Sequence, residues 1–135
     1  MSRLPVADQA ERDRLATELD RTFFVEAGAG TGKTRELVSG IAARVAAGRL
    51  RMERLAAITF TVAAAGELRV RIREALEERA GADAVPEEER LRLRGSVAEV
   101  DRARIETIHA FCSALLRPRT RGAGGCAPRS TGWRR

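Results

Sequence analysis

The only lysine of the chain lies in a glycine-rich octapeptide, Ala27-Gly28-Ala29-Gly30-Thr31-Gly32-Lys33-Thr34. An apolar run, residues 23–25, precedes this octapeptide, and an amphipathic helical pattern follows it. A glycine-rich turn between a strand and a helix presents backbone N–H groups to phosphate oxygens, and the helix dipole adds partial positive charge there. Apart from Ala27, the octapeptide has the G-x-x-x-x-G-K-[ST] form of a phosphate loop. The motif therefore predicts a nucleoside triphosphate site on an α/β scaffold.

Two side chains of the loop have distinct expected roles. The compact ammonium of Lys33 fits between the β- and γ-phosphates, where a broad guanidinium fits less well, so Lys33 is the candidate catalytic residue. The hydroxyl of Thr34 is an oxygen ligand suited to Mg²⁺. Arg35 follows directly and is grouped with the cofactor-binding residues 27–34. The alternative is a flexible turn that carries a lysine by chance.

Composition indicates a soluble chain with one domain at most. It has 135 residues, of which 44% are hydrophobic and 33% charged. No apolar stretch is long enough to span a membrane, and the N-terminus lacks the apolar core of a signal peptide. Cys112 and Cys126 are too few for a disulfide framework, and Cys112 is expected as a small buried residue on the apolar side of a helix. We therefore expect a cytoplasmic protein.

The basic net charge of +6 is concentrated at one end of the sequence. Six arginines and no acidic residue lie between residues 117 and 135, whereas residues 1–116 carry equal numbers of basic and acidic side chains. The same C-terminal segment is rich in Gly and Pro and has no apolar periodicity, so residues 118–135 are expected to be disordered. Net charge therefore does not by itself indicate a nucleic-acid partner for residues 1–117.

Apolar periodicity predicts helices that alternate with short strands. Helices are expected at residues 6–20, 33–47, 62–79, about 86–100 and 107–116, with Gly48 as a C-cap. Strands are expected at residues 22–26, 55–60 and 104–106. Alternating strands and helices predict βαβ units, in which helices cover both faces of a parallel sheet.

Three ordered motifs resemble the N-terminal part of a UvrD/Rep-type superfamily 1 DNA helicase, of the branch that includes RecB and AddA. Residues 24–34 resemble the helicase form of the phosphate loop, in which alanine begins the octapeptide. Residues 57–61, with 63–69 and 71–73, resemble motif Ia. Residues 105–112 resemble motif Ib. The resemblance covers roughly residues 6–117, and it implies a partial RecA-like P-loop NTPase domain in residues 1–117.

The resemblance also implies cofactors and partners. Gln9 corresponds to the family's adenine-reading glutamine, whose amide selects ATP, although a solvated helix residue is an equally good interpretation from sequence alone. The loop after residues 57–58 and the motif at 105–112 correspond to contacts with single-stranded DNA. Threonine hydroxyls would bond phosphate oxygens, and Phe60 would offer either a stacking face or a core side chain. The implied DNA-binding residues are Thr59, Phe60, Thr61, Thr107 and His109.

The sequence does not contain the residues that would complete a catalytic ATPase site. Phosphoryl transfer needs a Mg²⁺-binding carboxylate, a carboxylate that orients water, and arginines from a second domain. No Asp-Glu pair after an apolar strand follows Leu116, and Glu26 and Glu106 are better interpreted as structural acids. The Arg-rich end suggests coding DNA read out of frame after about Arg117. We therefore expect a truncated fragment, inactive alone. The resemblance implies that its intact relative moves 3′ to 5′ in DNA repair or recombination, beside a RecC- or AddB-like subunit.

Two other functions fit part of the sequence. A non-catalytic ATP-binding module would explain the missing motifs, but it would not explain the composition of residues 118–135. A small P-loop phosphotransferase would fit the length, but motifs Ia and Ib have no role there. DNA-stimulated ATP hydrolysis is the discriminating assay: the helicase fragment should show essentially none, whereas a phosphotransferase should turn over ATP with a small acceptor.

Overall fold

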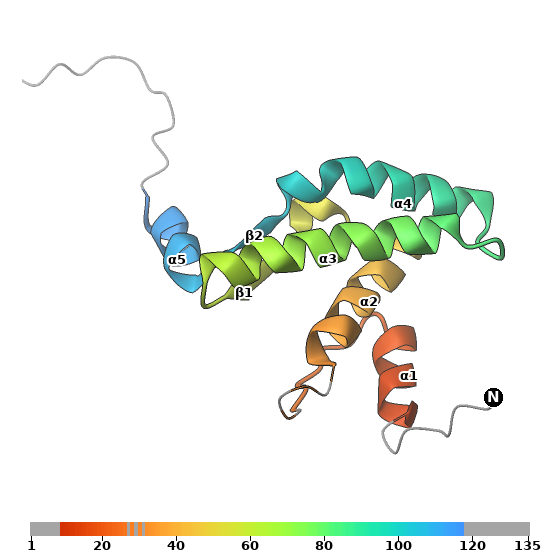
Figure 1. Cartoon of the computed structure of the whole chain (residues 1–135), viewed down its shortest axis with the longest axis horizontal. Coiled ribbons are helices and arrows are strands. Elements are labelled where there is room, and N and C mark those ends of the chain that lie inside the picture. Colours follow the sequence, from red (N-terminus) through yellow and green to blue (C-terminus); the bar gives the residue numbers. More distant parts are fainter. Residues whose placement is uncertain (1–8, 27, 29, 31, 118–135) are drawn as a thin grey trace, which may run out of the picture.

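The computed structural model describes residues 9–26, 28, 30 and 32–117. The expected disorder of residues 118–135, the start of the first helix, and Ala27, Ala29 and Thr31 lie outside the described residues. Figure 1 shows the order of the elements along the chain. They are α1 (Gln9–Thr17), α2 (Lys33–Ala46), the 3₁₀ turn η1 (Met52–Arg54), β1 (Ala56–Thr59), α3 (Val62–Gly81), α4 (Glu87–Glu99), the 3₁₀ turn η2 (Val100–Arg102), β2 (Arg104–Thr107) and α5 (Ile108–Leu116).

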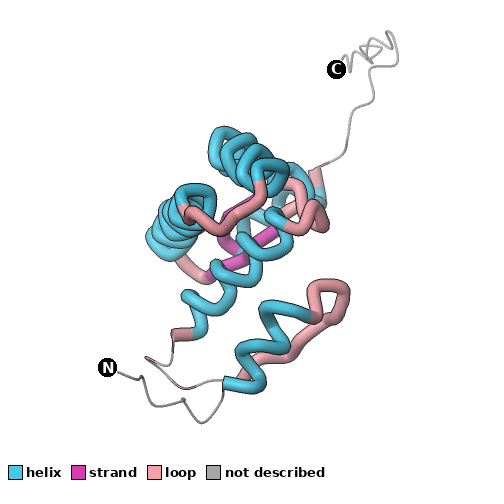
Figure 2. The backbone as a smooth tube through the Cα atoms, turned by 90° about the vertical axis from the view of Figure 1, so that its right-hand side faces the viewer, coloured by secondary structure: helices cyan, strands magenta, loops and turns pink. Residues whose placement is uncertain are grey.

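The two strands form a parallel pair, with Ala56 opposite Arg104 at one end and Thr59 opposite Thr107 at the other. Parallel strands cannot be joined by a tight turn, so the chain crosses over through α3 and α4 before it returns as β2. Figure 2 shows the strands in magenta beside these helices. The α/β class is therefore confirmed as a two-stranded parallel sheet flanked by helices.

The hydrophobic core lies between α2, α3, α4 and the sheet. Leu68, Ile72 and Leu76 recur every four residues on α3, as the sequence predicts, and all three are buried. Leu93 of α4 and Met52 of η1 are fully buried against them. The other core residues are Val38, Ile41, Ala42, Val45, Ala46, Ala65, Ala80, Val100, Ala103 and Ile105.

Arginine side chains connect the elements through backbone carbonyls. Arg92 of α4 donates from Nε to the Ala46 carbonyl of α2 at 2.9 Å. Arg69 of α3 donates from Nη2 to the Ile105 carbonyl of β2 at 3.0 Å. Arg44 of α2 donates from Nε to the Leu19 carbonyl at 3.2 Å. Each of these bonds joins segments that are distant in sequence, so arginine has a structural role in this fold.

Local sequence explains several helix ends. The Thr61 hydroxyl accepts from the Ala64 N–H at the start of α3, and the Thr107 hydroxyl accepts from the Ala110 N–H at the start of α5. At the end of α2 the Gly48 N–H donates to Val45 and the Arg49 N–H donates to Arg44, which is the Schellman pattern expected of a C-terminal glycine.

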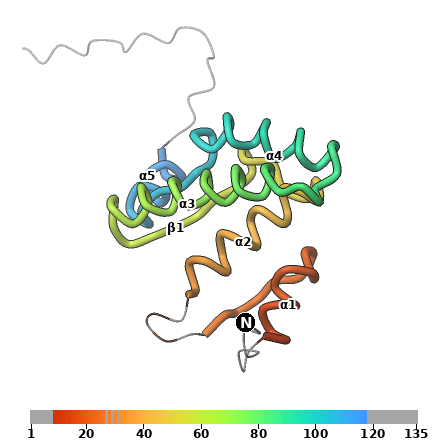
Figure 3. Tube along the Cα trace, turned by 45° about the vertical axis from the view of Figure 1, so that its right-hand side comes forward, coloured from red at the N-terminus to blue at the C-terminus, as the bar shows by residue number. Residues whose placement is uncertain are grey.

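Helix α1 and the segment after it lie beside α2, away from α3 and α4 (Figure 3). The helix ends at Thr17 and not at residue 20, and the Leu19 N–H donates to the Thr17 carbonyl at 3.0 Å, outside the helical pattern of bonds four residues back. Beyond this end, a side-chain hydrogen bond from Arg14 lowers the pKa of the Glu18 carboxyl. Among the described residues, no helix has the length and apolar character that a bilayer crossing requires.

Two expectations from the sequence are wrong. Residues 22–26 do not form a strand: they lie in the loop between α1 and α2, and Phe24 is 93% exposed. Apolar β-propensity alone does not make a strand without a hydrogen-bonding neighbour. Cys112 is exposed and not buried, and no residue of α5 is buried among the described residues.

We predict that Leu76→Ala lowers the free energy of unfolding by about 2–5 kcal/mol, because it leaves a cavity in the middle of the core. Leu76 has 0% exposure, whereas Leu91 on α4 is 60% exposed. The matched control Leu91→Ala should therefore change stability by less than about 0.5 kcal/mol. Urea denaturation followed by circular dichroism measures both; equal effects of the two variants would contradict this packing.

We also predict that the chain associates with itself as its concentration rises. Phe60, Val62 and Leu116 are at least 80% exposed, and within the described residues β1 pairs with β2 alone. Exposed apolar side chains and an open strand edge favour pairing between chains. Sedimentation velocity should show oligomers at micromolar concentration, and Ile58→Lys on β1 should reduce them. A monomer at all concentrations would contradict the prediction.

Candidate functional site

The glycine-rich loop leads directly into α2. Gly30 and Gly32 have φ angles of +75° and +87°, a backbone region that side chains with a Cβ rarely adopt. Gly32 is the N-cap of α2, and no side chain of the described residues caps this end of the helix. A helix N-terminus that follows such a turn carries partial positive charge and presents backbone N–H groups, an arrangement that suits an anion.

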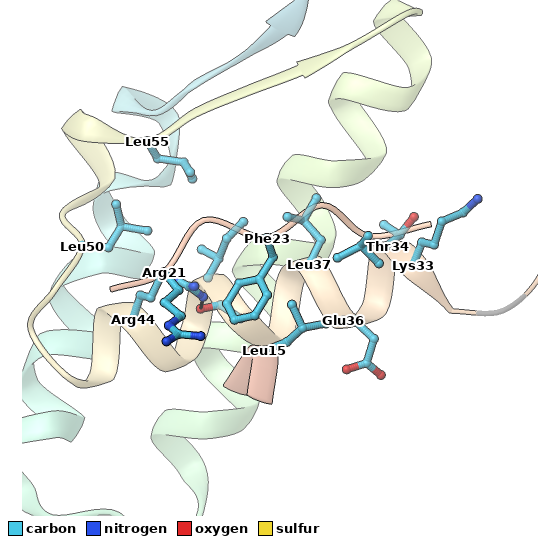
Figure 4. A pocket seen from close by; sticks show the side chains of 13 residues that line it. Leu15, Arg21, Phe23, Lys33, Thr34, Glu36, Leu37, Arg44, Leu50 and Leu55 are labelled. Carbon is cyan, nitrogen blue, oxygen red and sulfur yellow. Dashed lines mark hydrogen bonds between the residues drawn. The ribbon is translucent and has the colours of Figure 1, made fainter. Parts of the chain in front are cut away.

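A pocket of about 620 Å³ lies between α2 and residues 21–25. Lys33 and Thr34 lie at one end of it, apart from Arg21 and Arg44 at the other end (Figure 4). The rest of the lining is mostly apolar and includes Leu15, Phe23, Val25, Leu37, Ile41, Leu50 and Leu55. Groups that suit phosphate therefore lie at both ends of the pocket, with Lys33 and Thr34 nearest the glycine-rich loop.

Gln9 lies in the first turn of α1, where its Nε2 donates to Asp13 Oδ1 at 2.8 Å. It is not among the residues that line the pocket with Lys33. The helix that carries it is nevertheless tied to the start of α2, because Arg12 Nη1 lies 2.6 Å from Glu36 Oε1. The structure therefore connects the helix that carries Gln9 to the helix that follows the phosphate loop. The connection is made by Arg12 and Glu36, which motif analysis did not identify.

A second pocket, of about 470 Å³, joins the loop end of α2 to the sheet. Thr34 and Thr59 both line it, together with the ion-paired side chains Glu67 and Arg71 of α3. Glu67 and Arg71 are four residues apart on a predicted helix, and this spacing alone could have predicted their ion pair. The structure thus brings the predicted Mg²⁺ ligand Thr34 and the predicted DNA-binding residue Thr59 to one pocket.

Most of the predicted DNA-binding residues gather at the carboxyl ends of the strands. Thr59 and Thr107 are direct partners in the parallel register. Phe60 follows Thr59 and is 90% exposed, so it is not a core residue. Thr61 is exposed, and its carbonyl accepts a bond from the Thr59 hydroxyl at 3.0 Å. His109 is exposed in the first turn of α5. In open α/β sheets ligands bind at this edge.

Arg35 lies apart from the other cofactor-binding candidates. It lines a separate groove between α2 and α3, with Ser39 of α2 and Arg79 of α3. Successive residues of a helix point about 100° apart, so the side chain of Arg35, two positions after Lys33, points toward the opposite side of α2. The grouping of Arg35 with the phosphate loop therefore finds no support in its position.

The residues that the structure describes contain no cluster of three or more His, Cys, Asp or Glu side chains suited to a metal ion. Near the loop, the hydroxyl of Thr34 is one candidate oxygen ligand, and the carboxylate of Glu36, which lines the same pocket, is paired with Arg12. This fits Mg²⁺ bound with a nucleotide, since Mg²⁺ retains several water ligands and takes others from phosphates.

The sequence matches a known family over most of its length. The UvrD/REP helicase N-terminal domain matches residues 8–130. Curated relatives include an ATP-dependent helicase/nuclease subunit of Geobacillus thermodenitrificans, 40% identical over 99 residues, and its counterpart in Desulforudis audaxviator, 42% identical over 102 residues. The corresponding protein of Syntrophomonas wolfei is 37% identical over 107 residues.

These alignments cover 72%, 73% and 79% of this chain, and 8% of each relative. The chain therefore spans only a small part of the length of the curated relatives that it matches. The names of these relatives agree with the RecB- and AddA-like branch that the motifs indicate. Because the family match includes most of the described residues, the chain belongs to the UvrD/REP helicase N-terminal domain family.

Proposed function

We propose that this chain is the ATP-binding part of an ATP-dependent DNA helicase, which binds Mg²⁺–ATP and single-stranded DNA. The observation that carries the proposal is the juxtaposition of Thr34, in the first turn of α2, with Thr59 at the carboxyl end of β1. A nucleotide on the loop and a strand of DNA on the sheet edge would therefore be neighbours. The family relationship supports both ligands.

In this proposal the backbone amides of residues 27–34 surround the phosphates. The ammonium of Lys33 lies against the β- and γ-phosphates, and the Thr34 hydroxyl ligates Mg²⁺. The bound metal ion would neutralise charge on the phosphate oxygens. Gln9 would read the adenine edge with its carbonyl oxygen and the N–H that does not donate to Asp13.

The DNA would lie across the carboxyl ends of β1 and β2. The hydroxyls of Thr59, Thr61 and Thr107, with His109, would contact the backbone phosphates, which positions a strand without reading its sequence. The exposed ring of Phe60 offers a base a stacking face, an interaction of about 1–3 kcal/mol per base. These contacts are sequence-tolerant, as an enzyme that moves along DNA requires.

Hydrolysis and movement are proposed for an intact relative and not for this chain alone. The relatives are named as subunits of an ATP-dependent helicase/nuclease, and the chain spans 8% of their length. In such a protein the carboxylates and arginines of other segments would complete the site. We propose 3′ to 5′ movement during DNA repair or recombination in the cytoplasm, beside a RecC- or AddB-like subunit.

We predict that Lys33→Ala weakens Mg²⁺–ATP binding by at least about tenfold, because it removes the charge that faces the phosphates. Titration of the chain at sub-micromolar concentration into a fluorescent ATP analogue, followed by anisotropy, measures the change. Arg49→Ala is the matched control, since it removes one positive charge just beyond the opposite end of α2. Equal affinities of Lys33→Ala and the parent chain would refute the nucleotide site.

We predict that the chain binds ATP but hydrolyses it no faster when single-stranded DNA is added. Residues 117–135 contain no Asp or Glu that could orient water, so this polypeptide should bind ATP without DNA-stimulated turnover. Phosphate release with and without oligothymidylate tests this. Phosphate transfer to a small acceptor would instead favour a P-loop phosphotransferase, and binding of ATP without any DNA binding would favour a simple nucleotide-binding module.

A further inference from the structure

Helix α5 has few contacts that fix its direction. It is a nine-residue apolar helix with no buried residue, and it starts immediately after β2. Of its side chains only that of Phe111 is half-buried, and the others are exposed. The side chain that covers Phe111 therefore has a large influence on where α5 points.

Arg104 of β2 covers that ring. The guanidinium carbon of Arg104 lies 4.7 Å from the centre of the Phe111 ring, within the range of a cation–π contact. Its Nε and Nη2 atoms lie 3.0 and 2.9 Å from Glu106 Oε1. Because residues two apart share one face of a strand, Glu106 can hold the guanidinium plane over the ring. Arg104, Glu106 and Phe111 thus form one contact unit between β2 and α5.

The strand beneath this unit is itself anchored. Ile105, between Arg104 and Glu106, faces the core and is 3% exposed. Its carbonyl accepts the bond from Arg69 of α3. Arg104 therefore extends from a fixed strand, and its contact with Phe111 transmits that fixed position to α5.

We propose that Arg104 is a positioning residue for single-stranded DNA: held by Glu106 and stacked on Phe111, it sets the direction of α5 and so the place of His109 beside the Thr59–Thr107 pair. The inference rests on the proposed DNA-binding function. Thr107 ends β2 and caps α5, so a rotation of α5 about this residue moves His109 relative to the strand ends.

The test compares Arg104→Met with Arg102→Met. Both remove one arginine charge, but Arg102 lies in η2 and contacts Glu99 at 3.3 Å, away from Phe111. A spin label on exposed Cys112, in a Cys126→Ser background, reports the mobility of α5. Oligothymidylate binding by fluorescence anisotropy, at matched salt, reports the DNA site. Binding of the fluorescent ATP analogue verifies that each variant is folded.

We expect Arg104→Met to raise the mobility of the label and to weaken DNA binding about fivefold, because a part-exposed cation–π contact with an ion pair is modest in strength. Arg102→Met should change neither readout, and Arg104→Lys should restore part of both. ATP binding should be equal in all variants.

Two results would overturn the inference. Unchanged label mobility in Arg104→Met would show that Arg104 does not fix α5. Increased mobility with unchanged DNA affinity would show that the contact only stabilises the helix. If the parent chain binds no oligothymidylate, the proposed DNA-binding function fails together with this inference. If the parent binds and Arg104→Met binds equally tightly, this inference alone fails.

Discussion

Because β1 and β2 run in the same direction, the chain between Thr59 and Arg104 must cross the sheet before it can return. Helices α3 and α4 make this crossing, and most core residues lie on α3 and α2. The same constraint brings both strand ends to one edge, where Thr59 lies opposite Thr107. The segments that resemble motifs Ia and Ib are far apart in the sequence, and the parallel pairing of β1 with β2 places their ends side by side.

The sequence predicts well those elements whose signals are local. The spacing of Leu68, Ile72 and Leu76 predicts α3, although the helix continues to Gly81. Threonine caps and the glycine after α2 also act within a few residues. The strand expected at residues 22–26 fails because pairing depends on a neighbour elsewhere in the chain, and Cys112 fails because its burial depends on what packs on α5.

The candidate site also combines features that local sequence predicts with features that depend on tertiary packing. The glycine-rich loop, Lys33 and Thr34 can be identified from one short motif, since the backbone conformation and the helix start are encoded together. The meeting of Thr34 and Thr59 at one pocket depends on how α2 packs beside β1. The pair Arg12–Glu36 joins residues 24 apart, and neither residue belongs to a motif. Such tertiary contacts become visible only when the helices are placed in space.

The use of arginine in this fold limits which groups could serve the proposed DNA site. Arg44, Arg69 and Arg92 donate to backbone carbonyls, and many other arginines of the described residues pair with nearby carboxylates. Residues 1–116 carry no net charge, so the general attraction of a basic surface for phosphate contributes little there. In the proposed function, DNA binding at the sheet edge would then depend on a few oriented groups, the threonine hydroxyls and the Phe60 ring. Oriented groups act only while their elements keep their direction, and for α5 the contact between Arg104 and Phe111 provides that direction.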